Sequence, residues 1–393
     1  MLSLFRRPDR GGVLVSAALI VRNEERHLEA CLASLAGFVD EIVVVDTGSR
    51  DGTLAIAEAY GAQIGHFPWI DDFSAARNAA LDRATGRWIL YIDADERLVA
   101  TVAERAAARR MLATRRLAGA HVRLQAHKDL GSYRELRLFR NDPRIRFEGI
   151  IHETIWPALE RYRLKTFRGI GATGLRLEHV GYEGPQDHKY ARDKPLLLRE
   201  LARKPDHLYC WYHLGIVERG LGNIEAAREA HNRAIEVGRK TRPRDLVESL
   251  SWCELIGLDL DEDSEAARKR ARTLIAKARA RFPKQPRLEW LAARILMRDD
   301  RLAEANKLLR TLRDRSPDPD DRLAYDPQLF GLLPTEALAR NLFKLEDYAA
   351  AAEEFAEADR LAGGVEEFRI KQRLSEGLAR EKARIRAANA AAG

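Results

Sequence analysis

Two carboxylates one residue apart, Asp93 and Asp95, follow the short apolar segment 88–92. A segment of that length and composition is typical of a buried strand, so both carboxylates are expected where the strand meets solvent. Mg²⁺ and Mn²⁺ prefer oxygen ligands, and one or two carboxylates together with substrate phosphates are enough to hold them. The pair is therefore a candidate site for a metal-bound diphosphate. The alternative is an ordinary acidic turn.

A third acidic residue, Asp46, ends the apolar segment 41–46 and precedes a loop that contains Gly48 and Gly52. The glycines allow a tight turn, and the carboxylate can accept hydrogen bonds from a base or a ribose. The alternative is a capped loop in which Asp51 or Thr53 begins the next helix. The two interpretations are compatible.

Alternating strands and helices must position these residues. Short apolar segments predict strands at 14–21, 41–46, 62–68 and 88–92. Polar or capping residues open the predicted helices at 24–36, 52–60 and 73–84. This order predicts a mostly parallel sheet covered by helices, which binds ligands beyond the carboxyl ends of its strands. Further short strands, which extend the sheet with an acceptor-facing lobe, are predicted at 121–126, 136–140, 147–154 and 175–180.

The chain after residue 184 is rich in Ala, Leu, Arg and Glu with helical periodicity. A triplet with offsets of four and then three recurs there: Ala227, His231, Ala234; Ala271, Ile275, Ala278; Ala305, Leu309, Leu312; Ala351, Phe355, Ala358. The first members are 44, 34 and 46 residues apart, and 34 is the tetratricopeptide period. Two of the triplets are followed by prolines, Pro283 and Pro317. The first-helix and turn positions of the best copy are matched by Trp211, Leu214, Gly215 and Gly222.

This half of the chain therefore resembles a short tetratricopeptide solenoid, whose stacked helix pairs leave a concave surface for a partner. The alternative is that the helices only brace the first domain or form a homodimer interface.

Composition narrows the class of protein. The chain has 393 residues and a formal net charge of +7, and its length predicts two or three domains. The cysteines Cys31, Cys210 and Cys253 form no Cys-x-x-Cys pair, which argues against a disulfide framework and a zinc knuckle and favours the cytoplasm. Neither a secretory signal nor a membrane-spanning segment is predicted. Arg and Glu are interleaved along helical stretches, so no nucleic-acid partner is expected.

Four segments in the first hundred residues, 19–25, 44–53, 73–78 and 93–96, resemble the family 2 glycosyltransferases with a GT-A fold. Within that family the chain is most similar to the soluble branch with C-terminal tetratricopeptide repeats, which includes bacteriocin S-glycosyltransferases. The later segments that carry this similarity are 136–140, 149–153 and 179–182, followed by Lys189 and Arg192. The resemblance implies an α/β, GT-A (Rossmann-like) nucleotide-sugar domain at 1–190. An all-α tetratricopeptide-like solenoid follows at 191–393.

The resemblance also implies a role for each matching residue. Those implied to bind the donor are Glu24, Asp46, Arg77, Asn78 and Asp93. Those implied to hold Mn²⁺ or Mg²⁺ are Asp95, Asp93 and His179, and imidazole is a suitable ligand for Mn²⁺.

The implied reaction is transfer of a hexose-type sugar from a nucleotide diphosphate, with UDP-sugar preferred, and with inversion at the anomeric carbon. The metal offsets charge on the departing diphosphate, and a base removes the proton of the acceptor. Glu153 is the first candidate for this base, His152 the second, and Glu148 is less favoured. In a strand at 147–154, His152 and Glu153 would face opposite sides, so only one would face the cleft. The alternative for Glu153 is an ion pair with an arginine.

We therefore expect a cytoplasmic bacterial enzyme that modifies a peptide or protein presented along its repeats. Two alternatives are a glycosyltransferase that acts on a cell-envelope polysaccharide or lipid-linked acceptor, and a repeat scaffold with a vestigial site. The chain lacks a Gln-x-x-Arg-Trp motif and so does not resemble the processive synthases of the family. It also lacks a Walker loop, a Gly-x-Gly-x-x-Gly fingerprint and a His-Glu-x-x-His helix.

Overall fold

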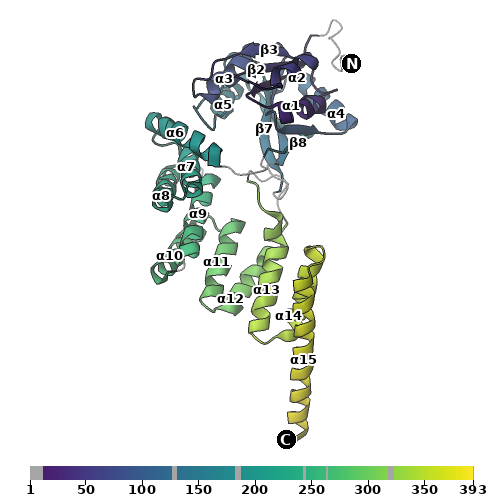
Figure 1. Ribbon diagram of the computed structural model, residues 1–393, viewed down its shortest axis with the longest axis vertical. Helices are drawn as coiled ribbons and strands as arrows, with labels where there is room; N and C mark the ends of the chain where they lie inside the picture. The colour runs from purple at the N-terminus through teal and green to yellow at the C-terminus, as the bar shows by residue number, and fades with distance from the viewer. Residues whose placement is uncertain are drawn as a thin grey trace. The chain divides into compact units, whose positions relative to one another are not determined.

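The computed structural model describes residues 12–125, 131–181, 187–241, 245–262, 264–316 and 323–392. The chain separates into two compact units, the first extending to Asn223 and the second comprising nearly all of the chain from Ile224 onward. Figure 1 shows strands in the first unit and helices in the second. The division into a catalytic domain at 1–190 and a repeat domain at 191–393 stays a prediction.

The first unit alternates strands and helices as predicted. Its first half contains β1 (Val15–Val21), α1 (Glu25–Ser34), β2 (Glu41–Asp46), α2 (Thr53–Ala59), β3 (Gln63–His66), α3 (Phe73–Leu81), β4 (Trp88–Tyr91), β5 (Glu96–Val99) and α4 (Val102–Ala113). Its second half contains β6 (Leu117–Gln125), β7 (Tyr133–Arg140), α5 (Trp156–Thr166), β8 (Gly169–His179), α6 (Asp187–Arg203) and α7 (Leu208–Gly220).

The eight strands form one sheet in the order β3-β2-β1-β4-β7-β6-β8-β5. Strands β1 to β4 are parallel to one another, so their carboxyl ends meet at one edge of the sheet. The later strands extend this sheet: β7 is antiparallel to β4 and β6, and β8 is antiparallel to β5. This confirms the predicted α/β fold with a parallel first half.

Both faces of the sheet are buried, because neighbouring residues of each central strand enter different hydrophobic clusters. In β4, Trp88 and Leu90 pack on one side with residues of α1 and α4. Ile89, between them, packs on the other side with residues of α3 and α5. Strands covered on both faces are continuous apolar runs. The apolar segments at 41–46 and 88–92 have that pattern.

One predicted strand is wrong. Residues 147–154 form a loop that is closed by an isolated bridge between Glu148 and Thr154. Gly149 has φ 106° and His152 has φ 50°, and residues in the left-handed region interrupt an extended strand. Three further elements, β5, α4 and α5, were not predicted from the sequence. The end of the predicted strand at 121–126, Ala126, lies outside the described residues, as do Tyr182 and Pro317.

The second unit contains the helices that the repeat predicted. They are α8 (Ile224–Lys240), α9 (Leu246–Glu262), α10 (Glu265–Arg281), α11 (Pro286–Arg298), α12 (Leu302–Arg313), α13 (Leu332–Lys344), α14 (Tyr348–Leu361) and α15 (Glu366–Ala392), with a short 3-10 helix at Pro327–Phe330. The four triplets lie on α8, α10, α12 and α14, and all twelve of their residues are buried. The predicted repeat is therefore confirmed, because its recurring small and apolar residues are the ones that the helices bury.

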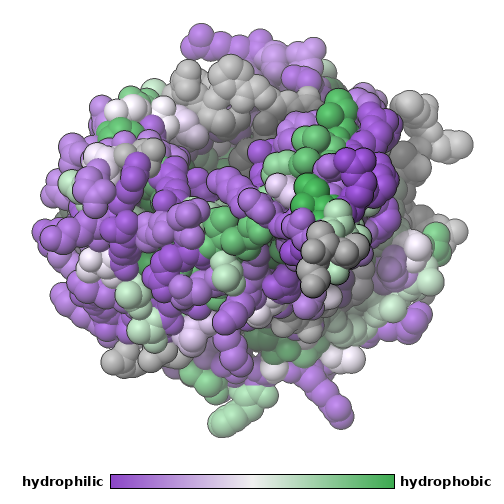
Figure 2. Space-filling view, turned by 90° about the horizontal axis from the view of Figure 1, so that it is seen from below, coloured by the Kyte–Doolittle hydropathy of each residue, from purple (hydrophilic) through white to green (hydrophobic). Residues whose placement is uncertain are grey.

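Figure 2 shows a face on which hydrophilic residues predominate, with apolar areas between them. Among the described residues, no helix is both long enough and apolar enough to cross a membrane.

Candidate active site

The ends of β1, β2 and β4 bring the first group of predicted residues together. The register of β1 and β2 pairs Val21 with Asp46, and Glu24 and Asp93 follow the ends of β1 and β4 by two or three residues. Two loops are joined here, because the Glu24 N–H donates to Thr53 Oγ1 (2.7 Å) and the Arg50 N–H donates to Asn23 Oδ1 (2.8 Å). This junction fixes the position of Glu24.

Asp46 is buried, and its carboxylate caps the loop that follows β2. Its oxygens accept hydrogen bonds from the backbone N–H groups of Gly48 (3.1 Å) and Ser49 (3.0 Å). The capped-loop interpretation is therefore present in the structure. Binding of a base or ribose by Asp46 stays a prediction.

A buried guanidinium links Asp93 to Glu153. Arg77, on α3, donates from Nη2 to Asp93 Oδ1 (2.8 Å) and from Nε to Glu153 Oε1. Although burial opposes ionisation of Asp93, Arg77 and then Arg137 hold its pKa down at about 2. The structure thus brings three predicted residues together. It also shows the alternative for Glu153, an ion pair with an arginine.

A second buried arginine lies behind this group, and its role was not predicted. Arg137, on β7, donates from Nη2 to Glu96 Oε1 (2.7 Å), and its Nη1 lies 3.8 Å from Asp93 Oδ2. Glu96 in turn accepts a hydrogen bond from the Asp93 N–H (2.9 Å). Burial raises the pKa of Glu96 to about 7 in spite of Arg137. Both residues lie in segments that carry the family resemblance, which was the only signal for them.

The pairing of β5 with β8 brings His179 to Asp95. The register places Glu96 opposite His179, and the Val180 N–H donates to the Asp95 backbone oxygen (2.9 Å). As a result, His179 Nε2 lies 3.0 Å from Asp95 Oδ2. Burial opposes the charged ring, but the hydrogen bond to Asp95 raises the pKa of His179 above its ordinary value. Two residues 84 positions apart in the chain are therefore direct neighbours.

Negative charge accumulates around Glu24. Burial, followed by the charges of Asp95 and Asp93, raises the pKa of Glu24 to about 7. A bound cation would relieve this repulsion. Within the part of the chain that the structure describes, no three His, Cys, Asp or Glu side chains form a ready metal cluster. Asp95 and His179 lie together, Asp93 is engaged by arginines, and metal binding by the three predicted ligands stays a prediction.

Asn78 and His152 point to other partners. The Asn78 amide donates to the Phe147 carbonyl (3.0 Å) and accepts from the Phe147 N–H (2.9 Å), so it holds the loop that contains Glu153. The ring of His152 stacks on His213 of α7, with ring centroids 3.8 Å apart. Burial lowers the pKa of His152 to about 4. The third candidate base, Glu148, pairs with Arg161 (2.5 Å).

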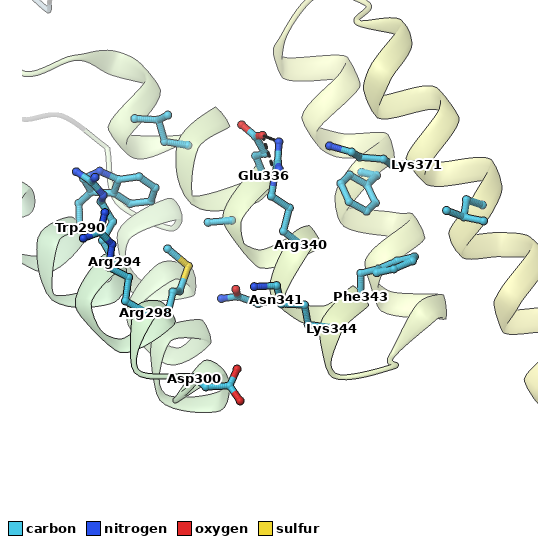
Figure 3. A pocket seen from close by; sticks show the side chains of 15 residues that line it. Trp290, Arg294, Arg298, Asp300, Glu336, Arg340, Asn341, Phe343, Lys344 and Lys371 are labelled. Atoms are coloured by element: carbon cyan, nitrogen blue, oxygen red, sulfur yellow. Dashed lines mark hydrogen bonds and ion pairs between the residues drawn. The ribbon is translucent and has the colours of Figure 1, made fainter. Parts of the chain in front are cut away.

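A large groove lies in the second unit, and the residues that line it all belong to that unit. It has a volume of about 900 Å³ and is formed mainly by α11, α13 and α15 (Figure 3). Apolar side chains such as Trp290 and Phe343 line much of it. The charged residues that line it are Arg294, Arg298, Arg340, Lys344, Lys371, Asp300 and Glu336. Cations outnumber carboxylates there by five to two.

Comparison with known proteins assigns the class of the first unit. Residues 16–109 match the sequence model described as glycosyl transferase family 2. This span contains the parallel strands β1 to β4 and the acidic residues at their ends. The N-terminal domain is therefore a family 2 glycosyltransferase domain.

Individual relatives agree with this assignment. A TPR repeat-containing protein of Synechococcus elongatus is 36% identical over 233 residues, which cover 57% of this chain and 57% of that protein. The prophage-derived glycosyltransferase SunS of Bacillus subtilis is 37% identical over 83 residues, which cover 21% of this chain and 20% of that protein. The chain thus spans little more than half of the first relative and about a fifth of the second.

Among solved structures, glucosyl-3-phosphoglycerate synthase from Mycobacterium tuberculosis, in complex with Mn²⁺, UDP and glucosyl-3-phosphoglycerate, has a TM-score of 0.35 and 16% identity. The likeness covers 49% of this chain and 81% of that one.

Proposed function

We propose that this protein is a metal-dependent, inverting glycosyltransferase that uses a nucleotide-diphosphate sugar, with UDP-sugar as the preferred donor. One observation carries the proposal: Glu24, Asp93 and Asp95 converge beyond the carboxyl ends of the parallel strands, and His179 joins Asp95 there. Ligands of open α/β sheets bind at this edge.

Asp95 and His179 are the residues that would hold Mn²⁺ or Mg²⁺. One carboxylate and one imidazole leave most coordination positions for diphosphate oxygens and water, as these ions require. When bound, the ion supplies charge stabilisation to the departing diphosphate. Asp93 is kept ionised by two arginines and would accept hydrogen bonds from the ribose. Asp46 and Glu24 would contact the nucleoside, and Arg77 and Asn78 would line the donor site.

Glu153 is better suited than His152 to act as the base. Its carboxylate is joined through Arg77 to Asp93, which would put it beside the donor if Asp93 binds the ribose. The ring of His152 instead packs against His213 and Tyr209 of α7. Glu153 would therefore remove the proton of the acceptor as the sugar is transferred.

A peptide or protein is the acceptor that the second unit supports. Its groove combines apolar side chains with an excess of cations, drawn from α11, α13 and α15 (Figure 3). A polypeptide offers apolar and charged side chains along one chain, as such a surface requires. Cell-envelope and lipid-linked acceptors belong in the same acceptor screen.

A thermal-shift screen tests the donor half of the proposal. Nucleoside diphosphates and nucleotide sugars would be added to the full chain with and without Mn²⁺. We expect stabilisation by a uridine nucleotide that is larger when Mn²⁺ is present, because a ligand that binds only the folded state stabilises it. If no nucleotide or nucleotide sugar stabilises the protein, the site is vestigial and the scaffold alternative replaces this proposal.

A further inference from the structure

The loop at 148–154, which carries Glu153, has a backbone conformation that needs support from neighbouring elements. Gly149 and His152 both have positive φ, and a non-glycine residue in that region costs about 1 kcal/mol or more. Only the isolated bridge between Glu148 and Thr154 pairs the loop with itself. Such a conformation persists where surrounding elements hold it.

Helix α3 holds one side of the loop. The Phe73 N–H donates to the Ile150 carbonyl (2.9 Å), and Asn78 makes two hydrogen bonds to the backbone of Phe147. Phe73 and Asn78 both lie within the segment 16–109 that matches the family, so this support comes from the family core.

Helix α6 holds the other side, although it lies more than 75 residues beyond that segment. The side chain of Glu200 is fully buried, and its Oε2 accepts a hydrogen bond from the Ile150 N–H (3.1 Å). Lys204 Nζ lies 3.5 Å from Oε1 and Arg203 Nη1 lies 3.8 Å from Oε2. These cations offset the cost of burying the carboxylate. A charged acceptor also forms a stronger hydrogen bond with a backbone N–H than a neutral one does.

Helix α7 adds an aromatic contact to the same loop. The ring of His152 packs against His213 (3.8 Å between centroids) and Tyr209 (5.2 Å). Ile150 is thus held by α6 and His152 by α7, and a single residue separates these two positions of the loop. Glu153 follows directly and meets Arg77.

We propose that Glu200 is a positioning residue for the transfer reaction: by holding the Ile150 N–H, it keeps the loop in the shape that places Glu153 against Arg77. Glu200 touches neither donor nor acceptor and acts only through the loop. The inference rests on the proposed function, since it assigns Glu153 its role. It also gives α6 a supporting role in the reaction, through the backbone of the loop.

Three substitutions at Glu200 test this, with hydrolysis of the nucleotide sugar as the reaction and water as the acceptor. Glu200→Leu removes the acceptor, Glu200→Asp keeps the charge but withdraws it from Ile150, and Glu200→Gln keeps an oxygen that can accept the bond. A displacement of catalytic groups by about 1 Å costs roughly 100-fold in rate. We expect kcat to fall by about that factor in the Leu variant and by roughly ten-fold in the Asp variant. In both, the KM for the donor should stay within about two-fold of wild type, and the Gln variant should recover most of kcat.

The matched control is Glu218→Leu, on α7. Glu218 is also a buried carboxylate with a lysine partner, and it accepts its hydrogen bonds from Lys194 (3.0 Å) and Asn223 (2.8 Å), both outside the loop. Its loss should lower stability without lowering kcat in proportion. Equal losses of kcat in the Glu218 and Glu200 variants would overturn the proposal, since burial alone would then explain both.

A double-mutant cycle with Glu153→Gln completes the test. If Glu200 acts through Glu153, then Glu200→Asp should cause almost no further loss of kcat in the Glu153→Gln background, because residues that act as a unit are not additive. Fully additive losses would contradict the proposal. A failure of the proposed function is a different result: the wild-type protein would neither bind nor hydrolyse any nucleotide sugar.

Discussion

The imidazole Nε2 of His179 lies 3.0 Å from the carboxylate Oδ2 of Asp95, across the edge where β8 pairs with β5. The contact depends on an antiparallel register that neither residue determines alone. It joins the acidic turn after β4 to β8, which is the last strand along the chain. Such a pair offers one oxygen and one nitrogen to a cation that also binds a diphosphate.

Replacing either member of this pair should remove the effect of Mn²⁺ on nucleotide binding. We expect Asp95→Asn and His179→Gln to weaken binding of UDP in the presence of Mn²⁺ by roughly ten-fold or more, which corresponds to about 1.4 kcal/mol. Isothermal titration calorimetry with and without Mn²⁺ measures this. Asp82→Asn is the control, because Asp82 is an exposed partner of Arg146. Equal Mn²⁺ dependence in all three variants would remove the metal assignment.

Gly181 should tolerate no side chain. A Cβ at this position would overlap the carboxylate of Asp95, so Gly181→Ala has to displace Asp95 from His179. We expect the Mn²⁺-dependent part of nucleotide binding to be lost while the protein stays folded. Gly257→Ala is the matched control: it lies in α9, where an added Cβ meets no atom within 4 Å. That change should leave binding intact and raise stability by about 0.5–1 kcal/mol.

Arg77 should matter for stability as well as for the site. Its removal leaves Asp93 and Glu153 without their shared cation, and breaking a buried ion pair in this way costs about 3 kcal/mol. Urea unfolding of Arg77→Met, followed by circular dichroism, measures the loss. Arg146→Met removes a surface ion pair with Asp82 and should cost less than about 1 kcal/mol. Similar midpoints for the two variants would show that the Arg77 pairs add little.

Stability should fall on acidification partly because of His152. Burial lowers its pKa from 6.5 to about 4, with Asp193, His207 and Arg192 as the nearby charges. Between those values the unfolded chain binds a proton that the folded chain excludes. The contribution is therefore present above pH 6.5 and is lost as the pH falls toward 4.

The variant His152→Asn isolates this contribution. Asn accepts the left-handed backbone at this position and does not titrate. We expect wild type to lose about 1–2 kcal/mol more than the variant between pH 7 and pH 5, as measured by urea unfolding. Burial also lowers the pKa of His207, which acts in the same direction in both proteins. Identical pH slopes would show that the ring of His152 titrates normally in the folded state.

The sequence by itself predicted the parallel strands β1 to β4, the helices between them and the repeat. A short apolar run such as 42–45, bounded by polar residues, favours a strand that is buried on both faces. The triplets predicted which residues of α8, α10, α12 and α14 are buried, because small residues at that spacing form one helix face. The acidic residues at the ends of β2 and β4 were predicted from the same pattern, although Asp46 is buried in the structure.

Only the tertiary structure decided which of these residues meet. Arg77 and Glu153 are 76 residues apart, and Glu200 reaches Ile150 across 50. Such contacts depend on strand register and on a loop whose positive φ angles have no periodic signal in the sequence, which is why 147–154 was predicted as a strand. The local pattern of apolar and polar residues predicts whether a residue is buried, because burial depends mainly on that residue's own side chain. The partner of a buried charge is a property of two distant segments, and it exists only once the sheet and the helices have packed.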